Sequence, residues 1–137
     1  MQADTLKEAL RHPSRIRDAA RRKSLIRFVQ DSMPAYKAGW VHHEVCEKLE
    51  KFLADAKAEK SPRLALFLPP GHGKSFISSE RFPAWSLGKH PELQLIVSSY
   101  SASLAEDFSR NALELAESSY IRRVFRNFKF GLKRTFN

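Results

Sequence analysis

The spacing of apolar residues predicts helices in the first part of the chain. From Ser14 to Gln30, apolar positions recur at helical spacing among arginines, and residues 31–34 break the pattern. A second amphipathic helix is predicted from about His42 to Lys57, because its apolar residues form one continuous stripe. A short helix is also expected over residues 3–11, ending before a proline. The stripe of the second long helix consists of Val45, Leu49, Phe52, Leu53 and Ala56.

The pattern changes after residue 62. Residues 63–68 and 93–97 are short, nearly continuous apolar runs, as expected for strands buried on both faces. A helix is predicted between them, from about Lys74 to Arg81, with a break or kink near Pro83. Another helix is predicted from about Ser103 to Ser118. Strand, helix, strand, helix in this order predicts an α/β fold in which the two strands are parallel.

Composition is that of a globular protein of one domain. The chain has 137 residues, of which 42% are apolar and 28% charged. No run approaches the ~20 apolar residues that span a bilayer, and the first residues lack a secretory pattern. The lone Cys46 cannot form an internal disulfide, which fits a reducing cytoplasm. We therefore expect a cytoplasmic protein without a membrane partner.

The net charge of +9 is concentrated at the two ends of the chain. Residues 1–30 carry +5 and residues 120–137 carry +6, whereas residues 31–119 carry −2. Basic ends can screen the phosphates of DNA or RNA. A solvated, soluble surface explains the same charges equally well.

The segment from Leu68 to Ser75 carries the strongest chemical signal. It is compared with the phosphate-binding pattern G-x-x-x-x-G-K-[ST]. The last three positions match as Gly73, Lys74 and Ser75, whereas Leu68 stands where the first glycine belongs. The segment lies between a predicted strand and a predicted helix, which is the context that the pattern requires.

Each residue type in this segment suits a nucleoside triphosphate. The glycines give backbone freedom, so that consecutive N–H groups and the following helix can point at a phosphate. The lysine can reach the outer phosphates, and the serine hydroxyl can bind Mg²⁺. We therefore expect ATP and Mg²⁺ as ligands, with Lys74 as the catalytic residue and Ser75 as the metal ligand. The alternative is a tight turn followed by a helix with a solvated lysine. The expected cofactor-binding residues are Pro70, Gly71, His72, Gly73, Lys74 and Ser75.

Two other groups of residues carry side chains that are able to bind a metal or another ligand. His42, His43 and Cys46 carry metal-binding side chains, but adjacent histidines on a helix diverge by about 100°, which favours packing or exposure. Residues 98–101, Ser-Ser-Tyr-Ser, follow the second predicted strand, at the end where α/β sheets place ligands.

Several spaced motifs together resemble the large terminase subunit of tailed bacteriophages. The resemblance covers about residues 16–125, and its motifs occur in the same order. They are residues 34–43 (PAYKAGWVHH), 68–75 (LPPGHGKS), 81–85 (RFPAW), 87–88 (LG), 99–110 (SYSASLAEDFSR) and the segment 120–125.

The resemblance implies a two-part motor. Its N-terminal part is a RecA-like P-loop ATPase that packages double-stranded viral DNA into capsids, and its C-terminal part is a nuclease. Implied partners are DNA, a small terminase subunit, a portal protein and further copies in a ring, in the host cytoplasm. Gly71, Gly73, Lys74 and Ser75 match the family's variant Walker A loop. Residues 34–43 match a region near the adenine, and residues 99–101 a segment that couples nucleotide to DNA.

The resemblance also has departures. Gly71 stands where family loops often have arginine, and no apolar run ending in paired acids follows Ser118. We therefore expect a chain cut short before Walker B and the nuclease, such as a prophage remnant or part of a split gene, that binds ATP–Mg²⁺ without completing hydrolysis alone. A helicase-like ATPase and a non-catalytic nucleic-acid-binding fragment are the alternatives.

The expected organisation has three parts. Residues 1–60 form a basic, amphipathic helical segment, residues 61–119 the P-loop βαβα core of an incomplete ATPase domain, and residues 120–137 a basic tail.

Overall fold

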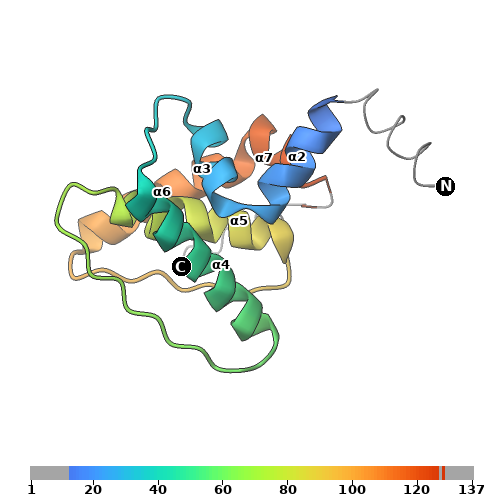
Figure 1. Cartoon of the computed structure of the whole chain (residues 1–137). Helices are drawn as coiled ribbons and strands as arrows, with labels where there is room; N and C mark the ends of the chain where they lie inside the picture. The colour runs from blue at the N-terminus through green and yellow to red at the C-terminus, as the bar shows by residue number, and fades with distance from the viewer. Residues whose placement is uncertain (1–12, 127, 129–137) are drawn as a thin grey trace, which may run out of the picture.

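The structure, a computed structural model, describes residues 13–126 and residue 128 (Figure 1). Its regular elements in that part of the chain are all helical. The helix expected over residues 3–11 lies outside the described residues. The elements are α2 (Pro13–Lys23), α3 (Leu25–Ser32), α4 (Trp40–Lys57), the π-helix η1 (Phe76–Arg81), α5 (Phe82–Lys89), α6 (Ala102–Glu117) and α7 (Ser119–Val124).

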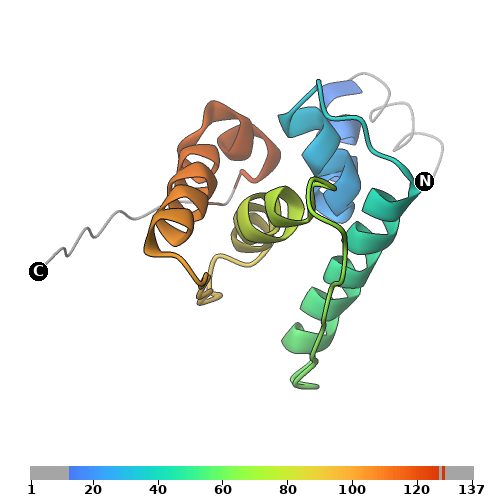
Figure 2. The same ribbon diagram turned by 90° about the vertical axis from the view of Figure 1, so that its left-hand side faces the viewer.

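The helices pack around a central rod made of η1 and α5. Figure 2 shows this rod between α6 on one side and α3 and α4 on the other. Helices α2 and α7 also pack against each other, although they lie at opposite ends of the described chain. The core is therefore built between helices, with its largest fully buried side chains on α3, η1, α5 and α7. These include Trp85, Phe28, Leu25, Ile77 and Ile121.

The predicted α/β, RecA-like fold with parallel strands is wrong for the described residues. Figure 1 shows residues 63–68 and 93–97 as drawn-out stretches of chain, called the extended segments below. They belong to no strand, and no backbone hydrogen bond joins the two segments within the described chain. A strand exists only when its N–H and C=O groups pair with those of a neighbour. The apolar runs therefore do not form the predicted strands, because neither of them pairs with a neighbouring segment of the described chain.

The two extended segments also lack the burial on both faces that their sequence predicts. In the first segment Leu66 and Leu68 pack against the helical core, while Phe67 between them is 93% exposed. In the second, Leu93 packs against the core and Ile96 is 95% exposed. Side chains alternate between two sides of an extended chain, so in the first segment one side meets the helices and the other is bare. In the second segment Leu95 and Val97 are also exposed, and only its first residue meets the core.

The helix predicted from Ser14 to Gln30 is two helices, because a distant residue interrupts it. Ser24 has extended dihedral angles (φ −126°, ψ 119°) and starts α3. The next N–H group, that of Leu25, donates to a carboxylate oxygen of Glu50 on α4 at 2.6 Å. A free N–H group at a helix start needs such an acceptor, and here another helix supplies it.

The helix after the loop continues through Pro83 instead of ending there. The six residues of η1 form a π-helix, in which the N–H of Phe82 donates to the carbonyl of Ile77. Pro83 then occupies the first turn of α5, where its missing N–H costs least. The rod thus runs to Lys89, eight residues beyond the predicted end at Arg81.

The other predicted helices are confirmed with small changes. Helix α4 begins two residues before the predicted His42 and buries Val45, Leu49 and Leu53 of the predicted stripe, while Ala56 is exposed. Helix α6 covers the predicted segment and starts one residue early, after Ser101. Neither helix, nor any other in the described chain, is long and apolar enough to cross a membrane.

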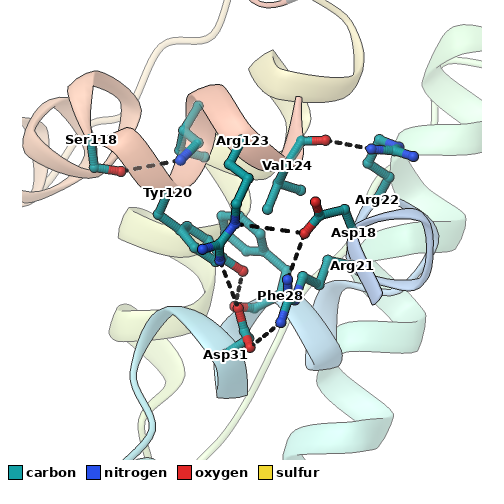
Figure 3. A network of polar contacts seen from close by, with 10 residues as sticks. Asp18, Arg21, Arg22, Phe28, Asp31, Ser118, Tyr120, Arg123 and Val124 are labelled. Carbon is teal, nitrogen blue, oxygen red and sulfur yellow. Dashed lines mark hydrogen bonds and ion pairs between the residues drawn. The ribbon is translucent and has the colours of Figure 1, made fainter. Parts of the chain in front are cut away.

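A charged cluster joins the two ends of the described chain (Figure 3). Asp18 on α2 is 2% exposed and lies 2.6 Å from Arg21 and 3.8 Å from Arg123 on α7. Asp31 on α3 contacts the same two arginines, at 2.5 and 3.9 Å. Burial alone would lower the pKa of Arg21, but the two carboxylates outweigh burial and raise it. Two acids and two bases therefore neutralise each other at the contact of α2, α3 and α7. The hydroxyl of Tyr120 lies in the same cluster, 3.4 Å from the carbonyl of Phe28.

Two further contacts fix the end of α7. Arg22 donates to the carbonyl of Val124 at 2.6 Å, which satisfies one of the free carbonyls at a helix C-terminus. The ring of Phe125 lies against Gly88 on α5 so closely that a Cβ there would be 2.5 Å from the ring. Gly88 therefore allows α5 to approach Phe125, the residue that follows α7, more closely than a larger residue would.

Candidate functional site

The glycine-containing loop of residues 68–75 connects the first extended segment to the central rod. Gly71 and Gly73 both have positive φ, 81° and 71°. L-residues with a side chain rarely adopt this conformation, so both positions depend on glycine. The resulting turn reverses the chain directly before Lys74, where helical geometry begins.

The loop rests on side chains that precede α4. A Cβ at Gly73 would lie 2.9 Å from the hydroxyl of Tyr36, whereas a Cβ at Gly71 would meet nothing within 4 Å. Tyr36 in turn stacks on Phe76, with ring centroids 5.2 Å apart, and meets the ring of His42 edge-on at 5.4 Å. Gly73 therefore needs glycine for space as well as for conformation.

His42 ties the loop to the start of α4. Its Nδ1 accepts the N–H of Gly39 at 2.8 Å, so the proton of the neutral ring is on Nε2. Nε2 then donates to the carbonyl of His72 at 3.1 Å. His72 fixes the loop internally, since its Nδ1 lies 3.1 Å from the carbonyl of Pro70. Both ring nitrogens of His42 thus serve backbone groups.

The hydroxyl of Tyr36 is a buried polar atom without a hydrogen-bond partner among the described residues. Burial raises the pKa of this hydroxyl, with a smaller contribution from Cys46. The group therefore keeps its proton at neutral pH and has one to donate, directly beneath Gly73.

Lys74 and Ser75 open into a cleft of about 510 Å³. The same cleft is also lined by Ser98, Ser99 and Tyr100, from the polar stretch after the second extended segment. The structure thus brings together two groups that are more than 20 residues apart in the sequence. The remaining predicted loop residues, 70–73, do not line the cleft but form the turn beside it.

The cleft is free of acidic lining residues. Its polar side is made of Lys74 and serines, and its apolar side includes Leu104 and Phe108 of α6. Lys74 forms no hydrogen bond or ion pair through its amine with any described residue, while its carbonyl accepts the hydroxyl of Ser78 at 2.9 Å. An unpaired ammonium group beside several hydroxyls is suited to an anion.

These features fit the phosphates that the sequence predicts. A Cβ at Gly71 would lie in open space, and the first N–H groups of the following helix have no intrahelical partner. Mg²⁺ typically takes one or two protein ligands together with phosphate oxygens and water, so the hydroxyl of Ser75 suffices as a protein ligand. In the described chain no three acidic, histidine or cysteine side chains come together as a separate metal site.

Sequence reasoning did not identify Tyr36 and His42 as supports of the loop. In the sequence His42 stands beside His43 and near Cys46, but its hydrogen bonds are with Gly39 and His72. A signal existed in the motif of residues 34–43, which contains both residues. Their distance from the loop in sequence hid the contact.

A comparison with protein families gives a match to this chain. The model of the family described as "Terminase large subunit, T4likevirus-type, N-terminal" matches residues 66–135, just over half of the chain, and this match includes the loop up to Lys74 and Ser75. No curated protein and no solved structure matches.

Proposed function

Because the chain belongs to the family of terminase large subunits of the T4-like type, we propose that its loop of residues 68–75 binds the phosphates of ATP–Mg²⁺. The activity that this site serves is the packaging of viral DNA. The observation that carries the proposal is the turn at Gly71 and Gly73, both at positive φ, which delivers Lys74 and Ser75 to one cleft.

The electrostatics of the cleft support a triphosphate. An ammonium group attracts phosphate oxygens most strongly where no carboxylate competes, and Lys74 has no acidic partner among the described residues. The helix that begins at Lys74 adds the positive end of its dipole and its free N–H groups. These two sources of positive potential come from adjacent residues, so one phosphate group can meet both.

The residues behind the loop hold the turn in place. The bond from His42 to the carbonyl of His72 and the close contact of Tyr36 with Gly73 restrict the loop before any ligand arrives. Such preorganisation lowers the entropy cost of binding. Mg²⁺ would supply charge neutralisation between the phosphates, and Ser75 would be its ligand from the chain.

Equilibrium binding of a fluorescent ATP analogue in the presence of Mg²⁺ tests the proposal. Lys74→Ala should weaken binding at least about tenfold, since a charge-assisted hydrogen bond contributes about 1.5–3 kcal/mol. The matched control is Lys48→Ala on α4, whose side chain is 56% exposed and, among the described residues, pairs with Glu44 at the surface. This variant removes the same charge and should bind as the parent chain does.

Circular dichroism of both variants shows whether the helices are retained. Equal affinities of the parent chain and a folded Lys74→Ala variant would rule out the site as proposed. Loss of affinity in both variants would indicate a response to net charge instead.

A further inference from the structure

A second cleft, of about 770 Å³, lies between the C-terminal ends of α2 and α5 and the turn that follows α7. It shares no lining residue with the cleft beside Lys74. Its lining includes Gly88 and Phe125, the pair that fixes α5 against the end of α7. The cleft is lined by five basic residues: Arg15, Arg22, Lys23, Lys89 and Arg126.

The charge of this cleft is not neutralised from within the protein. Its acidic lining residue is Asp18, whose carboxylate already meets Arg21 and Arg123. Arg15, Lys23 and Arg126 form no ion pair with any described residue. Five cations therefore face one carboxylate that is already paired.

Helix capping explains only part of this charge. Cations in the last turn stabilise a helix because its C-terminus carries about half a negative charge. The negative C-terminal ends of α2 and α5 together then neutralise about one of the five positive charges. Arg15 lies in the first turn of α2, where a cation is unfavourable, so capping does not explain its position.

The cleft forms where the two basic ends of the chain meet. Arg15, Arg22 and Lys23 come from the N-terminal basic region, and Arg126 comes from the C-terminal one. The bond from Arg22 to the carbonyl of Val124 holds the two regions together (Figure 3). On the third side, the amine of Lys89 lies 4.3 Å from the centre of the Trp85 ring. Positive charge that is separated in sequence is thus gathered in one rigid place.

We propose that this cleft binds the phosphodiester backbone of a nucleic acid. A cleft with several unpaired cations suits a ligand with closely and regularly spaced negative charges, and duplex DNA carries one per about 1.7 Å of helix axis. The arginines offer planar groups that bond two phosphate oxygens at once. A protein partner would need an apolar anchor, but Phe125, the aromatic residue of the lining, is 3% exposed. The inference rests on the proposed role with viral DNA but not on the nucleotide site.

Fluorescence anisotropy of a labelled DNA duplex, measured over a range of salt concentrations, tests this inference. The triple variant Arg15→Gln, Lys23→Gln and Arg126→Gln removes the three unpaired cations. In a plot of log affinity against log salt, its slope should be shallower by about 2–3, since each phosphate contact contributes about 0.9. Its affinity at about 0.1 M salt should fall at least about tenfold.

A matched triple variant separates the cleft from net charge. Lys37→Gln, Lys48→Gln and Arg63→Gln remove three exposed cations outside the cleft and change the net charge equally. This control should keep the slope of the parent chain. If it loses as much slope and affinity as the cleft variant, binding follows net charge and the inference is wrong.

A single variant, two competitors and the Lys74→Ala variant complete the test. If circular dichroism shows that the cleft triple variant has lost its helices, the single variant Arg126→Gln replaces it, and its slope should be shallower by about 1. Competition by poly-glutamate as strong as that by unlabelled duplex would indicate an acidic protein partner and overturn the inference, as would equal competition by inorganic triphosphate. Lys74→Ala should leave duplex binding unchanged, so that failure of the nucleotide site and failure of the cleft are distinguishable.

Discussion

The helical core and the two extended segments contain similar apolar residues, but the core buries their side chains and the extended segments leave several of them exposed. Phe28 on α3 is fully buried, whereas Phe67 in the first extended segment is 93% exposed. Trp85 on α5 is 1% exposed, whereas Ile96 in the second segment is 95% exposed. Apolar sequence alone therefore does not determine which residues form the core.

The difference lies in where each region obtains its backbone hydrogen bonds. A helix satisfies its own N–H and C=O groups, so α3 and α5 only need a partner for their side chains. An extended segment needs a neighbouring chain for its backbone before it can bury both faces. Residues 63–68 and 93–97 have no such neighbour in the described chain, and their outer side chains remain bare. Four predictions test this comparison, from the largest expected effect to the smallest.

Removing the same side chain from each region should have very different costs. Phe28→Ala should lower the free energy of unfolding by about 3–5 kcal/mol, because a buried phenylalanine leaves a cavity. Phe67→Ala should change it by less than about 0.5 kcal/mol, because its ring is already in water. Urea unfolding followed by circular dichroism measures both. A cost for Phe67→Ala close to that of Phe28→Ala would mean that the first extended segment is buried in solution.

The charged cluster between α2 and α7 should matter more than a surface ion pair. Asp18→Asn should cost about 2–4 kcal/mol, because Arg21 and Arg123 lose their fully buried carboxylate and keep only the partly exposed Asp31 among the described residues. Asp107→Asn removes a carboxylate from a pair with Arg110 in which both side chains are more than half exposed, and should cost less than about 1 kcal/mol. Urea midpoints of the two variants give the comparison. Equal costs would contradict the structural role of the cluster.

The contact between α5 and the end of α7 should not tolerate a methyl group. Gly88→Ala places a Cβ 2.5 Å from the ring of Phe125, and should lower stability by about 1–3 kcal/mol through overpacking. Gly39→Ala is the control, since its Cβ would meet nothing closer than 3.7 Å and its φ of −96° suits any residue. Thermal unfolding of both variants is the measurement. A stable Gly88→Ala variant would show that α7 does not dock as described.

The buried thiol of Cys46 should make stability sensitive to alkaline pH. Burial raises the pKa of Cys46 from 9.0 to about 12, with smaller contributions from Glu50 and Glu47. The folded chain then keeps a proton that the unfolded chain releases, so this contribution is fully present below about pH 9 and is lost as the pH rises toward about 12. Cys46→Ala should lose less stability between about pH 8 and about pH 10 than the parent chain. Urea midpoints across this range measure the effect, and parallel losses in the two proteins would refute it.

Local patterns were sufficient for the helices that the sequence predicted correctly. The stripe through Val45, Leu49 and Leu53 specifies α4, because helical spacing alone places these residues on one face. The start of α3 could not be predicted from the local sequence. Ser24 is extended there, and the N–H of Leu25 donates to Glu50, which lies 25 residues further along the chain. The buried role of Asp18 was also hidden, because its partner Arg123 lies on the last helix.

The strands failed for a different reason. A short apolar run such as residues 63–68 indicates extended backbone, but it does not say which segment pairs with it. At the candidate site, the sequence identified the glycines, Lys74 and Ser75 through their order in one motif. It could not reveal that Tyr36 and His42 lie behind the turn, because those contacts arise from tertiary packing.

The contact between α2 and α7 has a consequence for the order of events during synthesis. Arg22 and Val124, which form a hydrogen bond, are 102 residues apart in the sequence. Asp18 and its partner Arg123 are separated by a similar number of residues. At about 5–20 residues per second, the ribosome therefore synthesises α2 several seconds before it synthesises α7. During that interval α2 can pack on α3 through the pair of Arg21 with Asp31, but Arg22 and Asp18 lack their contacts with α7, and this part of the core closes only once α7 has emerged.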